Sequence, residues 1–176
     1  MRRFGLARAM HFAVMLAGMM GATTMAAQAA DPSLSPAANK AFMDDFAKQR
    51  GAVKRPSGLE YRIIRNGFGA TPAADDTVTV YYKGKLVNGK VFDATEPGFP
   101  AQFQVSGVIP GWTEALELMR EGDEWELVIP SSLAYGIRGA GDAIPPNQTL
   151  DFDVTLVKVT KATRHPDQGD SDQSQQ

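Results

Sequence analysis

Alternating apolar and polar residues are the clearest pattern along this chain. Apolar side chains at every second position are typical of a half-buried strand, and four stretches show this spacing. The predicted inward rows are Leu59, Tyr61 and Ile63; Val78, Val80 and Tyr82; Trp125, Leu127 and Ile129; and Leu150, Phe152, Val154 and Leu156. The acids between them, such as Glu60, Asp151 and Asp153, are expected to face water. Asn88-Gly89 lies between two apolar runs and predicts a tight hairpin.

Helical spacing appears in two places. Trp112, Ala115, Leu116 and Met119 predict a central helix that ends at Gly122. Near the N-terminus, Ser35 is a predicted N-cap and Pro36 suits the first turn of a helix that Gly51 would end. The apolar stripe of this second helix is thin, consisting of Phe42, Phe46 and Met43. It could dock on the main domain or form half of a dimer contact.

Several antiparallel strands with one short helix predict an α+β domain. The sheet would wrap around the central helix and bury both apolar faces, with a short N-terminal helix added outside. We expect this domain at residues 57–160, after an N-terminal helical segment at residues 30–56. Residues 161–176 are polar and nearly without apolar side chains, so we expect a disordered tail.

Residues 1–29 have the pattern of a secretory signal peptide. Three arginines precede the apolar run FAVMLAGMM, and small residues ending in AAQAAD follow it. The alternative is a single membrane anchor, but the run is short and broken by Gly and Thr. We therefore expect export, most simply to a periplasm and alternatively out of the cell, with no membrane span left after processing.

Composition excludes several kinds of site. The chain has no cysteine and only two histidines, His11 and His165, so a thiolate or histidine metal site and a Ser-His-Asp triad are not expected. The net charge is −2, which gives no basic footprint for nucleic acid. GIRGAG follows LAY and leads into IPP rather than a helix, so it does not predict a nucleotide site.

The stretch SGVIPGW places a tryptophan directly after a Pro-Gly step. Taken singly, this Trp and the nearby aromatic and aliphatic residues fit a plain core. Taken together, their positions near loops predict a shallow apolar dish. The set consists of Tyr82, Phe92, Val108, Ile109, Trp112, Tyr135, Ile144 and Phe152. The Pro110-Gly111 turn should leave the Ile109 amide free to bind a carbonyl beside the indole.

Five motifs in order, VTVYYKG, NGKVFD, GVIPGW, SSLAYG and IPPNQTLDFDVTL, resemble the FKBP-type peptidyl-prolyl cis-trans isomerases. The resemblance covers roughly Ser57 to Thr160. The N-terminal helix, PSGLEY and the leader resemble exported bacterial members related to the macrophage infectivity potentiator group. Those members carry a longer helical dimerisation segment, so the resemblance leaves monomer and dimer open.

The resemblance implies a role for each matching position. Trp112 would be the floor under the proline ring, and Asp93 would stand at the wall near the twisting imide. The Ile109 amide and the Tyr135 hydroxyl would each bind a substrate carbonyl. Ala143 and Ile144 would belong to an overhanging loop. The remaining lining would be Tyr82, Phe92, Val108 and Phe152.

Three positions depart from the pattern of the eukaryotic members. Ala101 replaces a wall aromatic, the arginine that commonly pairs with the pocket aspartate is missing from TEPGFPAQF, and Ala140 stands where some members carry a histidine. A wider pocket would follow, which affects a macrolide ligand more than turnover.

The implied chemistry needs no nucleophile, metal, cofactor or proton transfer. An apolar site disfavours the charge-separated resonance form of an X-Pro imide, and hydrogen bonds to flanking carbonyls hold the twisted geometry. The expected function is isomerisation of X-Pro bonds in unfolded or partly folded exported polypeptides. The alternative is a non-catalytic module that holds proline-containing segments in the same dish.

Overall fold

The computed structural model describes residues 31–163 of the chain. Their main feature is a sheet of seven strands, all paired antiparallel, in the order β1-β2-β6-β7-β3-β4, with β5 also paired to β3. The strands are β1 (Ala52–Lys54), β2 (Glu60–Arg65), β3 (Thr77–Leu86), β4 (Val91–Ala94), β5 (Ala101–Gln104), β6 (Glu124–Ile129) and β7 (Leu150–Thr160). The α-helices in this described part of the chain are α1 (Pro36–Phe46) and α2 (Pro110–Leu116).

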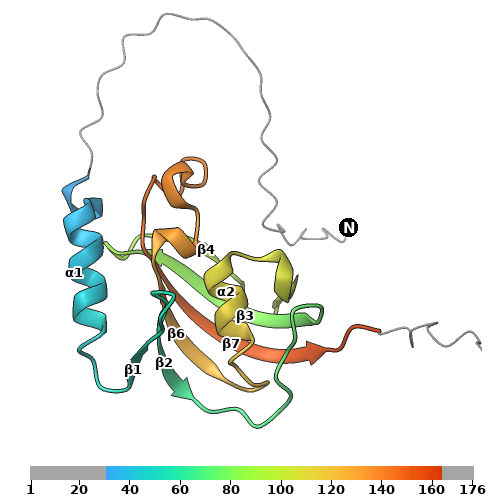
Figure 1. The fold of residues 1–176 in the computed structure, drawn as a ribbon. Coiled ribbons are helices and arrows are strands. Elements are labelled where there is room, and N and C mark those ends of the chain that lie inside the picture. Colours follow the sequence, from blue (N-terminus) through green and yellow to red (C-terminus); the bar gives the residue numbers. More distant parts are fainter. Residues whose placement is uncertain (1–30, 164–176) are drawn as a thin grey trace, which may run out of the picture.

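The sheet curves around α2, as Figure 1 shows, and this confirms the predicted α+β architecture. The inward rows of β3, β6 and β7 are buried, and they pack with α2 in one core. The predicted hairpin joins β3 to β4, where the Leu86 N–H donates to the Lys90 carbonyl (2.9 Å). Gly89 has a φ of 83°, a left-handed conformation that glycine adopts without strain.

Helix α2 is shorter than its sequence pattern predicts. It ends at Leu116 rather than near Gly122. After Leu116 the N–H groups begin to donate to the carbonyl three residues earlier, as in a 3-10 turn. The Met119 N–H, for example, donates to the Leu116 carbonyl (3.1 Å). Asp123 then accepts from the Arg120 N–H (2.7 Å) and directs the chain into β6. Met119 is still fully buried, so its spacing correctly predicted its environment but not its conformation.

Helix α1 begins as predicted and ends early. The Ser35 hydroxyl accepts from the Ala38 N–H (3.2 Å), which is the expected N-cap. The α-helix stops at Phe46, whose carbonyl accepts from the Gln49 N–H (2.9 Å) in a tighter turn. Gly51, with a φ of 82°, completes the reversal into β1 instead of ending the helix itself.

The outer face of the sheet departs most from the alternation rule. Glu60, Val128 and Asp151 are neighbours across β2, β6 and β7, and all three are buried although they point away from the core. The predicted exposure of Glu60 and Asp151 is therefore wrong, whereas that of Asp153 is confirmed. In β2 the end of the predicted inward row is also wrong, because Ile63 is exposed.

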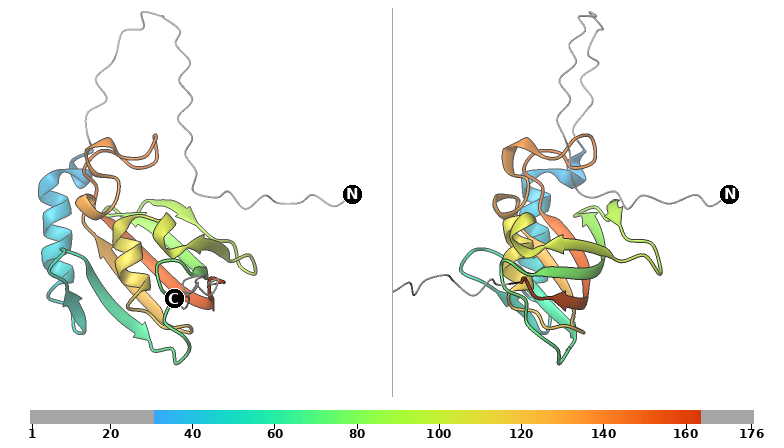
Figure 2. Two further views of the ribbon diagram at one scale, coloured as in Figure 1. Left: turned by 45° about the vertical axis from the view of Figure 1, so that its right-hand side comes forward. Right: turned by 90° about the vertical axis from the view of Figure 1, so that its right-hand side faces the viewer.

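Helix α1 lies at the β1 end of the sheet (Figure 1) and also buries an apolar side chain there. Phe46 is only 1% exposed yet lies outside the inner core. Figures 1 and 2 both show α1 beside the strands at the β1 end of the sheet. The buried Glu60 carboxylate pairs with Lys54 (2.8 Å), which reaches it from the edge strand. The N-terminal helix also docks on its own domain, because Asn39 of α1 forms hydrogen bonds with Gln148 and Thr149. Dimerisation stays a prediction.

The predicted leader, residues 1–29, and nearly all of the predicted tail lie outside the described residues. Within residues 31–163, no helix is both long enough and apolar enough to cross a bilayer. The predicted domain boundaries stay predictions.

Candidate active site

Trp112 stands in the first turn of α2, where the Pro-Gly step directs it into the core. Ile109 is the N-cap and Pro110 the first helical residue, a position that needs no N–H donor. Gly111 lets the helix approach β6 closely, because a Cβ there would lie 2.4 Å from Cγ2 of Ile129. As a result the Trp112 indole is 4% exposed, and it lies against the inner face of the sheet.

Aromatic rings surround this indole edge-on. Tyr82 and Phe152 each have their ring centroid 5.3 Å from that of Trp112, at interplanar angles of 87° and 81°. The centroid of the Phe103 ring lies 5.9 Å from that of Trp112, at an interplanar angle of 85°. Phe92 in turn meets Phe152 at 5.5 Å and 90°. Edge-to-face pairs of this kind are each worth about 0.5–1.5 kcal/mol beyond their buried area, so the arrangement of the cluster is well fixed.

Phe103 is the site residue that the sequence reasoning missed. It lies on β5, half-buried, and contacts both Trp112 and Tyr82. The signal was present in PAQFQV, where Ala101 and Phe103 alternate with glutamines on either side. Ala101, the predicted substitute for a wall aromatic, is half-buried and packs against the same core.

Partly exposed residues border the aromatic cluster on the side of the loops, and we call this border its opening. Its partly exposed members come from β4, from the segment before α2, and from the segment between β6 and β7. They are Phe92, Val108, Ile109, Tyr135 and Ala143, all packed against the core, and Ile144 is buried beside them at 4% exposure. The structure thus packs the ten predicted site residues on or around one core, with Asp93 joined to it through Tyr82.

Asp93 and Tyr82 form the polar part of the wall. The Tyr82 hydroxyl donates to the Asp93 carboxylate at 2.6 Å. Burial and this hydrogen bond raise the pKa of Tyr82, so its phenol stays protonated and keeps donating. Among the described residues Asp93 forms no ion pair, which agrees with the missing arginine in TEPGFPAQF.

Two hydrogen-bond donors remain without a protein acceptor at this opening. In residues 31–163, neither the Ile109 N–H nor the Tyr135 hydroxyl donates to another group. Burial raises the pKa of Tyr135, and the Asp93 carboxylate raises it further, so the hydroxyl is a donor throughout the neutral range. Two free donors beside an apolar surface can bind the carbonyls of an extended peptide.

Ala143 and Ile144 belong to a compact turn in the segment between β6 and β7. The Ala140 N–H donates to the Ile144 carbonyl (2.8 Å), and the Ile144 N–H donates back (3.2 Å). Gly139 has a φ of 62°, and a Cβ there would lie 2.2 Å from the Ile144 carbonyl oxygen. Glycine is thus required for this turn to close.

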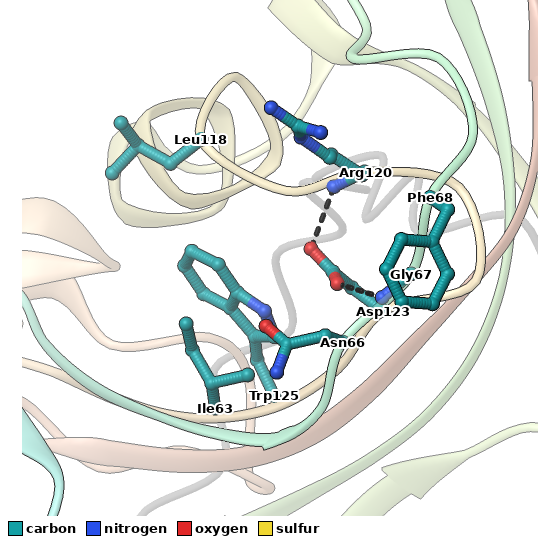
Figure 3. Close-up of a pocket in the computed structure, with 8 residues that line it drawn as sticks. All are labelled: Ile63, Asn66, Gly67, Phe68, Leu118, Arg120, Asp123 and Trp125. Atoms are coloured by element: carbon teal, nitrogen blue, oxygen red, sulfur yellow. Dashed lines mark hydrogen bonds between the residues drawn. The ribbon is translucent and has the colours of Figure 1, made fainter.

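A hollow of about 350 Å³ lies away from these residues. Figure 3 shows it between the segment after β2 and the segment before β6. Asp123 holds these segments together by accepting from the N–H groups of Gly67 and Arg120. Because the hollow includes none of the predicted site residues, it is not part of the aromatic cluster.

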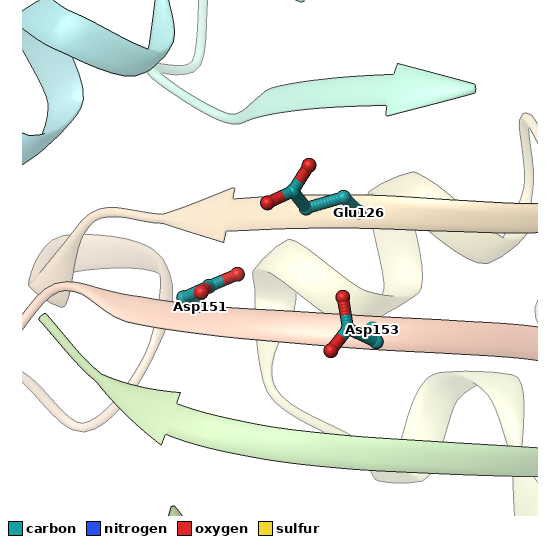
Figure 4. Close-up of side chains that lie close together, drawn as sticks. All are labelled: Glu126, Asp151 and Asp153. Carbon is teal, nitrogen blue, oxygen red and sulfur yellow. The ribbon is translucent and has the colours of Figure 1, made fainter. Parts of the chain in front are cut away.

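Three carboxylates gather on the outer face of the sheet, as Figure 4 shows: Glu126, Asp151 and Asp153. Lys85 bridges the two aspartates at 3.0 and 3.1 Å, and Arg62 binds Glu126 at 2.6 Å. Because these cations already pair with the three carboxylates, we interpret the cluster as an ion-pair network rather than a metal centre.

Comparison with known proteins agrees with this geometry. Residues 69–157 match the family of FKBP-type peptidyl-prolyl cis-trans isomerases. The outer membrane protein MIP of Legionella longbeachae is 54% identical over 123 residues, which are 69% of this chain and 53% of the relative. The FKBP-type 22 kDa isomerase of Escherichia coli is 52% identical over 119 residues, 67% of this chain and 58% of the relative. The chain thus spans little more than half the length of these relatives.

Two solved structures share the fold. A peptidyl-prolyl cis-trans isomerase from Pseudomonas syringae has a TM-score of 0.67 and 38% identity, with 71% of this chain and 92% of that chain covered. FkpA from Escherichia coli has a TM-score of 0.68 and 45% identity, with 70% and 58% covered. This chain therefore belongs to the FKBP-type peptidyl-prolyl cis-trans isomerase family.

Proposed function

We propose that this protein is a peptidyl-prolyl cis-trans isomerase that accelerates rotation about X-Pro bonds in exported polypeptides and so assists their folding. The observation that carries the proposal is an aromatic cluster around Trp112 with two unsatisfied donors at its opening, Ile109 N–H and the Tyr135 hydroxyl. Family membership supports it.

The apolar surface acts on the resonance of the imide. An X-Pro bond rotates slowly because resonance gives its C–N bond double-bond character, and the planar form is the more polar one. The proline ring lies on Trp112, within the walls made by Tyr82 and Phe152. Water is excluded there, so the polar planar form loses more solvation energy than the less polar twisted form does. The barrier to rotation falls as a result.

The free donors hold the peptide while the bond turns. The Ile109 N–H and the Tyr135 hydroxyl bind two carbonyls that flank the rotating bond, which fixes one part of the peptide relative to the other. Asp93 accepts from Tyr82 and keeps that phenol fixed in the wall. Its carboxylate also stands near the carbonyl that leaves the imide plane. All these groups act without changing their own protonation state.

Export, partners and assembly complete the proposal. The pattern of residues 1–29 supports export, and one relative is named an outer membrane protein. The clients are unfolded or partly folded polypeptides that contain proline. A macrolide would bind in the same dish, weakened by Ala101 and by the missing cationic partner of Asp93. The protein is a monomer or a dimer formed through α1.

A protease-coupled assay on X-Pro tetrapeptides tests the activity. The purified protein should accelerate cis-to-trans conversion, and Asp93→Leu and Tyr135→Phe should slow it while circular dichroism shows an unchanged fold. Titration of the same peptides by tryptophan fluorescence separates turnover from binding. Binding without acceleration would favour the alternative, a module that holds proline-containing segments.

A further inference from the structure

The segment between β6 and β7 is tied to the N-terminal part of the chain at its base. It runs from residue 130 to residue 149 and carries Tyr135, Ala143 and Ile144. Figures 1 and 2 show it, in orange, beside the N-terminal end of α1. The contact joins residues more than 100 positions apart through side-chain amides that none of the site chemistry uses.

Asn39 is the centre of this contact. It lies on α1, is only 6% exposed, and makes hydrogen bonds with both ends of its amide. Its oxygen accepts from the Thr149 N–H at 2.6 Å. Its nitrogen donates to the Gln148 side-chain oxygen (3.1 Å) and to the carbonyls of Leu34 (3.1 Å) and Ser35 (2.9 Å).

Gln148 carries the contact into the segment. Its side chain is equally buried, at 6% exposure, and its nitrogen donates to two carbonyls at once. One belongs to Leu34 in the N-terminal part (3.1 Å), and the other to Pro146 in the segment itself (3.1 Å). The Gln148 side-chain amide therefore fixes the position of the segment relative to the N-terminal part of the chain.

Short and stiff connections lead from this amide pair to the site. Pro145 and Pro146, whose φ angles are restricted by their rings, separate Gln148 from Ile144. The Asn147 N–H donates to the Gly136 carbonyl (2.8 Å), and Gly136 directly follows Tyr135. A displacement of Gln148 would thus also displace Ile144 in the overhanging turn and Tyr135, the proposed donor to the substrate.

Burial makes this contact costly to break. A buried amide that loses its partner is left with polar atoms that neither protein nor water satisfies, and the two amides share the Leu34 carbonyl. Neither can move away alone without leaving polar atoms unsatisfied. Core packing also holds the segment, but its base at Gln148 and Thr149 is bonded directly to the N-terminal part.

We propose that Asn39 and Gln148 are positioning residues through which helix α1 sets the position of Ile144 and Tyr135 over the dish. The N-terminal helix thereby controls how tightly substrate is held, in addition to covering the outer face of the sheet. This inference rests on the proposed isomerase function, because it concerns the same site.

Gln148→Glu and Asn39→Ala, made singly and together, test this inference. Gln148→Glu keeps the size of the side chain but removes the donor to Leu34 and Pro146. Each variant should raise KM for a Leu-Pro or Phe-Pro tetrapeptide by roughly 3- to 10-fold, with kcat changed less than about twofold. The double variant should raise KM little more than either single variant, because the amides act as a unit.

Hydrogen exchange at Ala140 and Ile144 gives a readout that does not need activity. These amides close the turn of the segment, and their exchange should speed up by roughly tenfold or more in each single variant. The matched control is Leu156→Val, a mild core change in β7 outside this contact. It should lower stability moderately and leave KM and exchange in the turn unchanged.

The outcomes separate the two proposals. Unchanged KM and unchanged exchange in Gln148→Glu would overturn the positioning role, as would equal effects in Leu156→Val. A wild-type protein that binds the tetrapeptides without accelerating their isomerisation would overturn the proposed function instead. In that case peptide affinity and turn exchange still decide the positioning role, and weaker binding with faster exchange supports it.

Discussion

Replacing Tyr135 with phenylalanine removes one of the two free donors at the opening of the aromatic cluster and no hydrogen bond that the fold uses. The Tyr135 hydroxyl makes no hydrogen bond within residues 31–163, so its loss leaves no protein group unsatisfied. Stability should change by less than about 0.5 kcal/mol. The ring itself, which packs against the core, is retained.

The expected loss of rate follows from the strength of one neutral hydrogen bond. Such a bond is worth about 1 kcal/mol net, and 1.36 kcal/mol corresponds to a tenfold change in rate. The value of kcat/KM in Tyr135→Phe should therefore fall roughly fivefold. The measurement is the protease-coupled rate on a Leu-Pro tetrapeptide, well below saturation.

The control and the pH dependence make this prediction refutable. Tyr81→Phe removes a phenol from β3, next to Tyr82 in sequence, and should leave the rate unchanged. Because burial and Asp93 raise the pKa of Tyr135, its hydroxyl is protonated below its shifted pKa and the wild-type rate should be flat from about pH 6 to 9. An unchanged rate in Tyr135→Phe, or equal losses in the two variants, would refute the reasoning.

Three further changes test other parts of the structure. Asp93→Leu removes the acceptor of a buried phenol and should lower kcat/KM about tenfold or more, with the fold intact by circular dichroism. Gly111→Ala brings a Cβ within 2.4 Å of Ile129, so urea unfolding should show a loss of about 1–3 kcal/mol despite the better helix propensity of alanine. The Lys161 ammonium and two backbone N–H groups lower the pKa of Asp76 to about 2. The stabilisation by this carboxylate is therefore present above its ordinary pKa of 3.8 and is lost as the pH falls toward 2. The stability of Asp76→Asn should depend less on pH between these values, and equal acid sensitivity of the two proteins would contradict this.

The sequence correctly predicted which residues are buried where one face of a helix or strand packs against the core. Val78, Val80 and Tyr82 alternate and are all buried, and the spacing of Trp112, Ala115 and Leu116 places them correctly. Alternation depends only on neighbouring residues and the pleat of a strand, so it can be read locally.

The sequence misled where a distant element covers the other face. Glu60 and Asp151 look like solvent-facing acids, but they are buried in one cross-strand row with Val128. No local pattern reveals that α1 returns to the sheet with Phe46 buried. The helix ends were also misplaced, because glycine at Gly51 and Gly122 marks the reversal of the chain rather than the last helical hydrogen bond.

For the site, the motifs led to residues that the fold brings together, since Trp112, Tyr82 and Phe152 contact one another directly. Asn39 shows what motifs cannot supply. Its importance comes from hydrogen bonds to Gln148 and Thr149, about 110 positions away, and an asparagine in a helix carries no sign of such partners.

The most direct test of the central claim is two-dimensional NMR exchange on a single X-Pro peptide in the presence of the protein. The cis and trans signals of a free peptide do not exchange on the NMR timescale, because uncatalysed rotation takes tens of seconds or longer. With a small amount of wild-type protein, exchange cross-peaks should appear, and they should weaken in Tyr135→Phe. Peptide signals that shift on binding but show no cross-peaks would contradict the account, because the dish would then hold proline without turning it.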